Sequence, residues 1–171
     1  MCRRLYSFFV VILIFAGSLV CYSSQLQADA QAIEIEQSDL VCAAQQLPLT
    51  GILMTNSFGE LYLKIDEKFQ RLPLTNPKLK KFTSQKGPHI QIVYDKEDQQ
   101  KQRKKPEYKE VGQSFPFKVV KAVEIHFKSG MTFLALEVDS PELEQLRIRN
   151  GFSSFPEHHD KFYIYLGLLN K

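Results

Sequence analysis

Short runs in which apolar and polar residues alternate occur along much of this chain, and they predict β-strands more often than helices. The strand-like runs cover residues 61–65, 89–94, 114–120, 122–127, 131–138 and 162–168. Asn76 and Ser140 are helix-capping residues, and each is followed by proline at the first helical position. Two helices are therefore expected, at 76–82 and from Ser140 towards Gly151. Because helix followed by strand occurs twice, the pattern predicts an α+β fold with two similar lobes.

The first thirty residues have the pattern of a targeting segment rather than of folded structure. Arg3 and Arg4 form a basic start, and an apolar run covers residues 5–20. Ala28-Asp29-Ala30 then supplies the small residues of a cleavage site. This order is typical of a secretory signal peptide, so residues 1–30 are predicted to be removed on export. The protein is then expected to be periplasmic or secreted.

Two other interpretations of this segment remain open but are less favoured. A permanent membrane anchor would need a longer apolar run, since roughly 17 residues is the lower limit for a spanning helix. Lipid attachment at Cys21 is disfavoured because the bulky Val20 precedes it. We therefore expect no stable membrane insertion after cleavage.

Residues 31–50 are predicted to be an N-terminal tether, and residues 51–171 a single domain. Residues 31–39 are polar without a clear period, whereas residues 40–49 could form a short helix or strand. Cys42 is the only cysteine left after cleavage, and its apolar neighbours predict a buried, inert thiol.

The charge of the chain is too small to make the whole molecule an electrostatic nucleic-acid binder. Its 171 residues include 22 Lys and Arg against 19 Asp and Glu, a formal net charge of +3. Many of the lysines lie close together in residues 95–109. They are interpreted as a solvated excursion between strands, with a phosphate-facing loop as the alternative.

Histidines are the main candidates for chemistry, because the phosphate-loop, nucleophile-elbow and zinc-protease motifs are all missing from the sequence. Strand alternation places His89 and Gln91 on one face, where an imidazole and an amide could transfer a proton and hold a phosphate. His126 is predicted to be exposed, and His158 and His159 to lie in a solvated turn rather than to bind a metal. No cofactor or metal site is expected.

Two segments of the chain resemble the two-histidine (2H) phosphoesterase superfamily, and its RNA-repair-like branch most. The first is Gly87-Pro88-His89-Ile90-Gln91-Ile92-Val93-Tyr94, and the second runs from Leu136 to Gly167. Members carry two His-x-Thr/Ser motifs, one on a central strand of each lobe. The resemblance implies two lobes of mainly antiparallel sheet with a central groove between them.

Both motifs of this chain depart from the family pattern. Gln91 stands where Thr or Ser is usual, Tyr163 falls at the second His and Tyr165 at the second Thr. The resemblance implies His89 and Tyr163 as catalytic residues, and Gln91 and Tyr165 as substrate-binding donors. Tyr163 does not fit the usual two-histidine mechanism, because an ordinary tyrosine pKa of ~10 suits proton transfer near neutrality poorly.

The implied function is an exported, diverged 2H-phosphoesterase-like protein with a phosphate-bearing ligand, either an RNA end or a cyclic nucleotide. It would bind the phosphodiester or cyclic phosphate, and would hydrolyse it if the altered second motif retains activity. The alternative is a catalytically inactive binding or interaction module of the same fold, with Phe162, Tyr163 and Tyr165 filling the groove. A fold unrelated to this superfamily is a third hypothesis.

Overall fold

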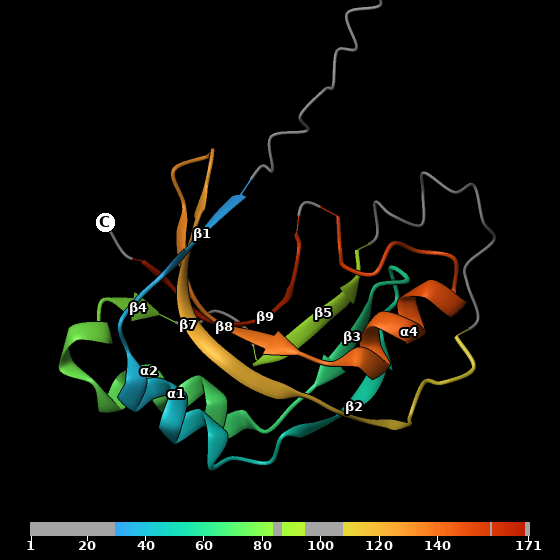
Figure 1. Ribbon diagram of the computed structural model, residues 1–171, viewed down its shortest axis with the longest axis horizontal. Helices are drawn as coiled ribbons and strands as arrows, with labels where there is room; N and C mark the ends of the chain where they lie inside the picture. Colours follow the sequence, from blue (N-terminus) through green and yellow to red (C-terminus); the bar gives the residue numbers. More distant parts are fainter. Residues whose placement is uncertain (1–29, 84–86, 95–107, 158, 170–171) are drawn as a thin grey trace, which may run out of the picture.

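The computed structural model describes residues 30–83, 87–94, 108–157 and 159–169 (Figure 1). The strands are β1 (Ala30–Glu34), β2 (Thr50–Thr55), β3 (Leu61–Lys64), β4 (Phe82–Thr83), β5 (His89–Val93), β6 (Ser114–Pro116), β7 (Lys118–Phe127), β8 (Thr132–Asp139) and β9 (Phe162–Leu169). The α-helices are α1 (Ser38–Gln45), α2 (Leu72–Thr75) and α4 (Pro141–Arg149). Two 3-10 turns, η1 (Glu67–Arg71) and η2 (Pro77–Leu79), flank α2.

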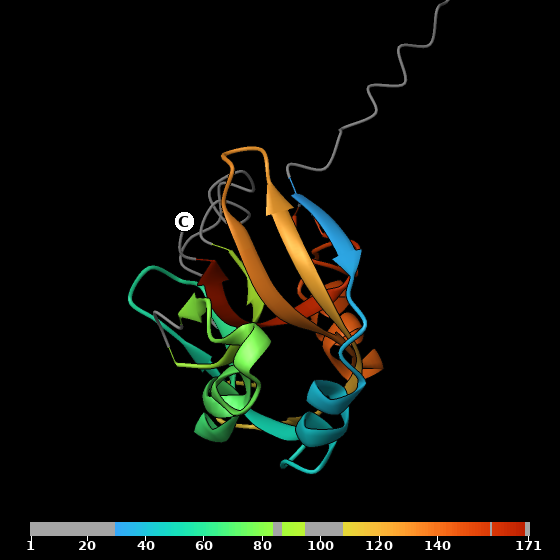
Figure 2. The ribbon, with the colours of Figure 1, turned by 90° about the vertical axis from the view of Figure 1, so that its left-hand side faces the viewer.

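The nine strands form one antiparallel sheet in the order β1-β7-β8-β9-β5-β3-β2-β6, with β4 paired to β9. β1 runs along the outer edge of β7 (Figure 2). The sheet curls strongly. β6 borders β2 near one end of the strand order, and β7 borders β1 and β8 near the other. Only one residue separates β6 from β7 in the chain, so the two ends of the sheet come close together. The predicted α+β fold with mainly antiparallel strands is therefore confirmed.

The same sequence of elements occurs twice along the chain. A hairpin of β2 and β3 is followed by helical turns, the two-residue strand β4 and then β5. A hairpin of β7 and β8 is followed by α4 and then by β9. The strands that end these two series, β5 and β9, are neighbours in the middle of the sheet. The boundary between β5 and β9 divides the sheet into two groups of four strands, with β4 left aside. One group is β1, β7, β8 and β9, and the other is β5, β3, β2 and β6.

The main hydrophobic core covers one face of the sheet, and the helices pack there. Leu40 and Ala44 of α1, and Leu143 and Leu146 of α4, are buried in this core together with the inward residues of the strands. Their spacing of four and three residues puts each pair on one side of its helix. A smaller cluster lies on the opposite face and consists of Val123, Ile125, Ala135 and Tyr163.

Both predicted capping residues act as caps, although only one of the two helices has the predicted length. Ser140 accepts a hydrogen bond from the Leu143 amide and starts α4. Asn76 accepts one from the Lys78 amide, 3.0 Å away, but only the single turn η2 follows. The chain leaves that turn early because Phe82 is buried in the core as part of β4, which pairs with β9.

The prediction of a tether over residues 31–50 is wrong, because this segment contains β1 and α1. β1 pairs with β7, and the Glu34 carboxylate lies 3.2 Å from the Lys121 ammonium. The side chains of β1 are mostly exposed, so its sequence has no apolar pattern that predicts a strand. Backbone pairing with β7 holds β1 in place. Cys42 is exposed rather than buried, since α1 turns its Leu40 and Ala44 side inwards.

Several sequence predictions fall outside the described residues. They are the signal peptide, apart from Ala30 in β1, most of the lysine-rich segment 95–109, and His158. Within the described ranges, we find no helix of the length and apolar character that crossing a bilayer requires.

Gly51 lies where β2 crosses the core, and its replacement by alanine tests how tightly this region is packed. A Cβ atom there would lie 2.7 Å from both Leu63 Cγ and the Lys64 carbonyl oxygen. Overpacking of this kind costs ~1–3 kcal/mol, so we expect Gly51→Ala to lower the free energy of unfolding by that amount in urea titrations. Gly87→Ala is the control, because a Cβ at Gly87 meets no heavy atom within 4 Å. Equal stability of the two variants would contradict the described packing.

Candidate functional site

Four side chains predicted from the sequence lie on the same face of β5 and β9. Ile90 of β5 pairs with Ile164 of β9, and both isoleucines are buried in the main core. Since successive side chains of a strand point to opposite faces, the neighbours of the two isoleucines point to the face that carries no helix. These neighbours are His89, Gln91, Tyr163 and Tyr165. The sheet therefore brings all four predicted residues together.

The His89 side chain is half-buried, and its orientation is defined by the backbone. Its Nδ1 lies 2.9 Å from the Gly87 carbonyl oxygen. A carbonyl only accepts hydrogen bonds, so Nδ1 carries the proton and Nε2 of the neutral ring keeps its lone pair. The Tyr62 ring packs edge-on at 5.7 Å, and Lys64 pairs with His89 across β3 and β5. The site thus has a proton acceptor with an exposed lysine on the adjoining strand.

Gln91 is more constrained than an exposed amide would be. Its side chain is 9% exposed, and its Nε2 donates a hydrogen bond of 2.7 Å to the Val93 carbonyl. A primary amide has two N–H groups, so one remains for a ligand. The predicted role of Gln91 as a donor is compatible with this geometry, but the amide can donate only one hydrogen bond to a ligand.

The two tyrosines of β9 are held by polar contacts and by burial. The Tyr163 hydroxyl donates to Asp160 Oδ1 over 3.3 Å, and the Tyr165 hydroxyl lies 3.4 Å from His159 Nε2. Burial raises the pKa of Tyr163, and the charges of Asp160 and Glu137 raise it further. Burial likewise raises the pKa of Tyr165, together with the neighbouring hydroxyls of Tyr94 and Tyr163. Both hydroxyls are therefore hydrogen-bond donors and poor acids near neutrality.

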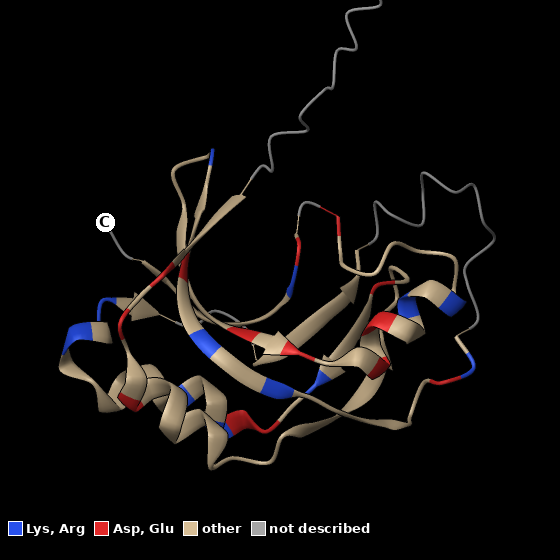
Figure 3. Cartoon of the chain, viewed as in Figure 1, with Lys and Arg blue, Asp and Glu red and all other residues tan. Residues whose placement is uncertain are grey.

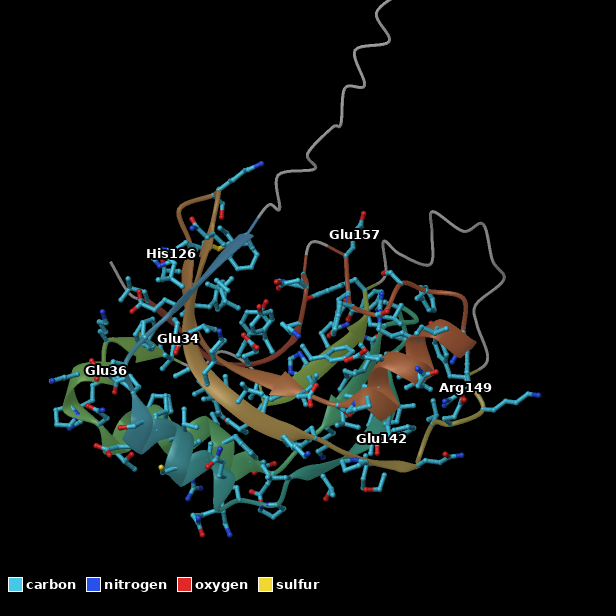
Figure 4. The ribbon with its side chains drawn as sticks, viewed as in Figure 1. Glu34, Glu36, His126, Glu142, Arg149 and Glu157 are labelled. Atoms are coloured by element: carbon cyan, nitrogen blue, oxygen red, sulfur yellow. The ribbon has the colours of Figure 1, made fainter. Side chains whose placement is uncertain are left out.

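His159 belongs to the same cluster, although its sequence context predicted a solvated turn. Its ring lies 5.4 Å from the Tyr163 ring and 6.3 Å from the Tyr94 ring, measured between centroids. With the contact to Tyr165, this half-buried imidazole touches both tyrosines at the second motif. The loop that carries it has no periodic pattern, so the sequence contained no signal for its direction. In Figure 4 the same loop rises above the sheet at Glu157.

A buried arginine attaches this loop to the sheet. Arg147 of α4 is 1% exposed, and its guanidinium donates to the Ser153 and Phe155 carbonyls, each over 2.7 Å. It also donates to the Ile92 carbonyl of β5. One side chain therefore connects the strand that carries His89 with the segment that leads to His159.

The remaining candidates lie away from this face. His126 is half-exposed, 3.4 Å from Glu124 and near the tip of the β7–β8 hairpin (Figure 4). Ile125 and Tyr163 lie in one cluster on the face that carries the candidate site. His126 follows Ile125 in β7, so its side chain points to the opposite face. Phe162 is buried in the main core, so the idea that it fills a groove beside Tyr163 is wrong.

Charged residues of both signs are spread over the described part of the chain (Figure 3). Glu137 pairs with Tyr163 across β8 and β9, and its carboxylate lies 3.6 Å from the Lys121 ammonium. That ion pair offsets part of the negative charge beside Tyr163. Among the described residues, no three His, Cys, Asp or Glu side chains gather closely enough to hold a metal ion.

The face thus combines a basic imidazole nitrogen, an amide and two tyrosine hydroxyls with a second imidazole nearby. Groups of this kind can donate hydrogen bonds to an oxyanion and accept or return a proton. Comparison of the chain with protein-family models, curated proteins and solved structures found no match.

Proposed function

We propose that this chain is an exported, diverged 2H-phosphoesterase-like protein, periplasmic or secreted, that binds a phosphodiester or cyclic phosphate of RNA or of a nucleotide. In this proposal the two series of hairpin, helix and strand are the two lobes. The phosphate lies in a groove over the line where β5 and β9 meet. His89 is the proton-transfer residue, and Gln91 and Tyr165 donate hydrogen bonds to phosphoryl oxygens. Tyr163, whose hydroxyl donates to Asp160, supports the second motif from below.

The pairing of Ile90 with Ile164 is the observation that carries the proposal. His89 precedes one isoleucine as Tyr163 precedes the other, so the first residues of both motifs occupy equivalent positions in the antiparallel pair. Gln91 and Tyr165 are equivalent in the same way. The two motifs are far apart in the sequence, and their symmetric placement about this pair supports a site that two similar lobes share.

The hydrogen-bonding groups of the face and the nearby Lys64 favour an anionic ligand. His89 Nε2 can accept a proton or, once protonated, donate to a phosphoryl oxygen. Lys64, on the adjoining strand, adds a positive charge next to it. The raised pKa values of Tyr163 and Tyr165 keep both hydroxyls protonated, which suits them to hold oxygens rather than to act as acids.

Aromatic rings next to the tyrosines favour a nucleotide over a simple phosphate. Phe133 packs edge-on against Tyr165 at 5.4 Å, and Phe127 packs against Phe133 at 5.6 Å. Both phenylalanines are half-buried on the β7–β8 hairpin. Aromatic side chains of this kind provide stacking surfaces for bases.

A second candidate function is a binding module of the same fold without catalysis. It is favoured by the 5% exposure of the Tyr163 side chain and by the raised pKa of its hydroxyl, which weaken its use as an acid. The two candidates share the ligand and differ in turnover.

The test has two measurements. Calorimetric titration measures the binding of adenosine 2′,3′-cyclic monophosphate and of adenosine 2′-monophosphate, and product analysis measures hydrolysis of the cyclic nucleotide. We expect both nucleotides to bind more tightly than adenosine, and His89→Ala to weaken their binding ~10-fold or more, which is about 1.4 kcal/mol. Any hydrolysis should fall by ~10²–10⁴-fold in this variant, the usual contribution of positioned proton transfer.

His126→Ala is the matched control, because it removes an imidazole from the other face of the sheet. It should leave binding unchanged. Binding without turnover would select the binding module over the enzyme. Failure of the two nucleotides to bind better than adenosine would refute both.

A further inference from the structure

We infer that His159 supplies a second imidazole to the phosphate site, in place of the histidine that the second motif lacks. This inference rests on the proposed function. It assigns to His159 the role of proton donor, and to Tyr163 the role of positioning the imidazole that packs against its ring.

The contacts of His159 support this role. Its ring packs edge-on against the Tyr163 ring, and its Nε2 is within hydrogen-bonding reach of the Tyr165 hydroxyl. Tyr163 itself is almost completely covered, whereas the His159 side chain is half-buried. A ligand that approaches the second motif therefore has an exposed part of His159 within reach, while little of Tyr163 is accessible.

His159 and the described residues 153–156 are held by hydrogen bonds, which define the position of the imidazole. The His159 amide donates to the Pro156 carbonyl over 3.0 Å, and Arg147 holds the Ser153 and Phe155 carbonyls. The same guanidinium contacts the Ile92 carbonyl of β5, next to the strand positions of the first motif. Such attachment is what a proton-transfer group needs, because its geometry has to be held within fractions of an ångström.

The chemical step balances with these two groups and water. His89 Nε2 takes a proton from the water whose oxygen forms the new bond to phosphorus. The bond from phosphorus to one ribose oxygen breaks, and protonated His159 gives its proton to that oxygen. The product is a nucleoside monophosphate, and exchange with solvent returns both imidazoles to their starting protonation states.

The experiment is nuclear magnetic resonance of the imidazole Cε1–H groups in the full protein, titrated with adenosine 2′-monophosphate. Three resonances are assigned by substitution of His89, His126 and His158 in turn, and the one that remains is that of His159. We expect the signals of His89 and His159 to shift at the same nucleotide concentrations, and the His126 signal to stay in place. In a hydrolysis assay, His159→Gln should lower the rate by ~10²–10⁴-fold and remove the loss of activity at high pH that a required acid produces.

A response of His89 without His159 would overturn this inference and leave the proposed function standing. A lack of response from both would overturn the two together. Because the resonances are followed in the unsubstituted protein, neither result depends on turnover or on the folding of the His159 variant.

Discussion

Replacement of Arg147 by methionine is expected to lower the free energy of unfolding by about 3 kcal/mol or more. The guanidinium is fully buried and donates to three carbonyls, those of Ile92, Ser153 and Phe155. A buried acceptor without a donor costs ~1–3 kcal/mol, and hydrogen bonds from charged groups are worth ~1.5–3 kcal/mol each. Methionine would relieve the cost of burying a charge, but it cannot satisfy three acceptors. The measurement is urea unfolding followed by circular dichroism.

Arg149→Met is the matched control, because it changes the same residue type on the same helix. Arg149 lies at the exposed end of α4, where its guanidinium is 3.4 Å from the Glu110 carboxylate (Figure 4). Exposed ion pairs contribute ~0.2–1 kcal/mol, so this variant should remain close to the parent protein. If both variants lost the same stability, the buried network around Arg147 would not be the cause.

Stability is also expected to fall as the pH rises above about 10, because two tyrosines ionise less readily in the folded protein than in the unfolded chain. The pKa values of Tyr163 and Tyr165 are raised above the ordinary 10.0, chiefly by burial. Above this pH the unfolded chain binds fewer protons than the folded protein, so the free energy of unfolding decreases with pH. The stabilisation is complete below pH ~10 and is lost as the pH approaches the folded-state values.

The double variant Tyr163→Phe/Tyr165→Phe provides the comparison for this prediction. Phenylalanine keeps the rings in place but has no proton to lose, so the alkaline decline should be shallower than in the parent protein. Urea unfolding at a series of alkaline pH values, with tyrosinate absorbance recorded in parallel, measures both effects. An equally steep decline in the two proteins would show that other groups control alkaline stability.

Local sequence patterns were sufficient to predict most strands and the starts of two helical segments, η2 and α4. Alternation identified β5 and β9, and it also predicted that His89 and Gln91 share a face, because side chains of a strand alternate whatever the strand pairs with. Ser140 and Asn76 were identifiable as caps because a cap acts on backbone amides two or three residues away. These features depend on neighbours in the chain.

Features that depend on distant partners could not be predicted in this way. β1 is mostly exposed and lies in place through its pairing with β7, so its own residues carry little apolar pattern. Cys42 has apolar neighbours, yet it is exposed because α1 meets the core with its Leu40 and Ala44 side. In both cases the environment of the segment, rather than its composition, decides the outcome.

The same distinction between local and distant determinants applies to the candidate site. The sequence by itself determined that His89 and Gln91 form one pair and that Tyr163 and Tyr165 form another. Only the pairing of Ile90 with Ile164 brought the two pairs onto one face, since register between strands far apart in sequence is set by the packing of the whole sheet. The approach of His159 to the tyrosines was likewise decided by the tertiary structure, because the loop before it is held by the buried guanidinium of α4 and not by any periodic pattern of its own.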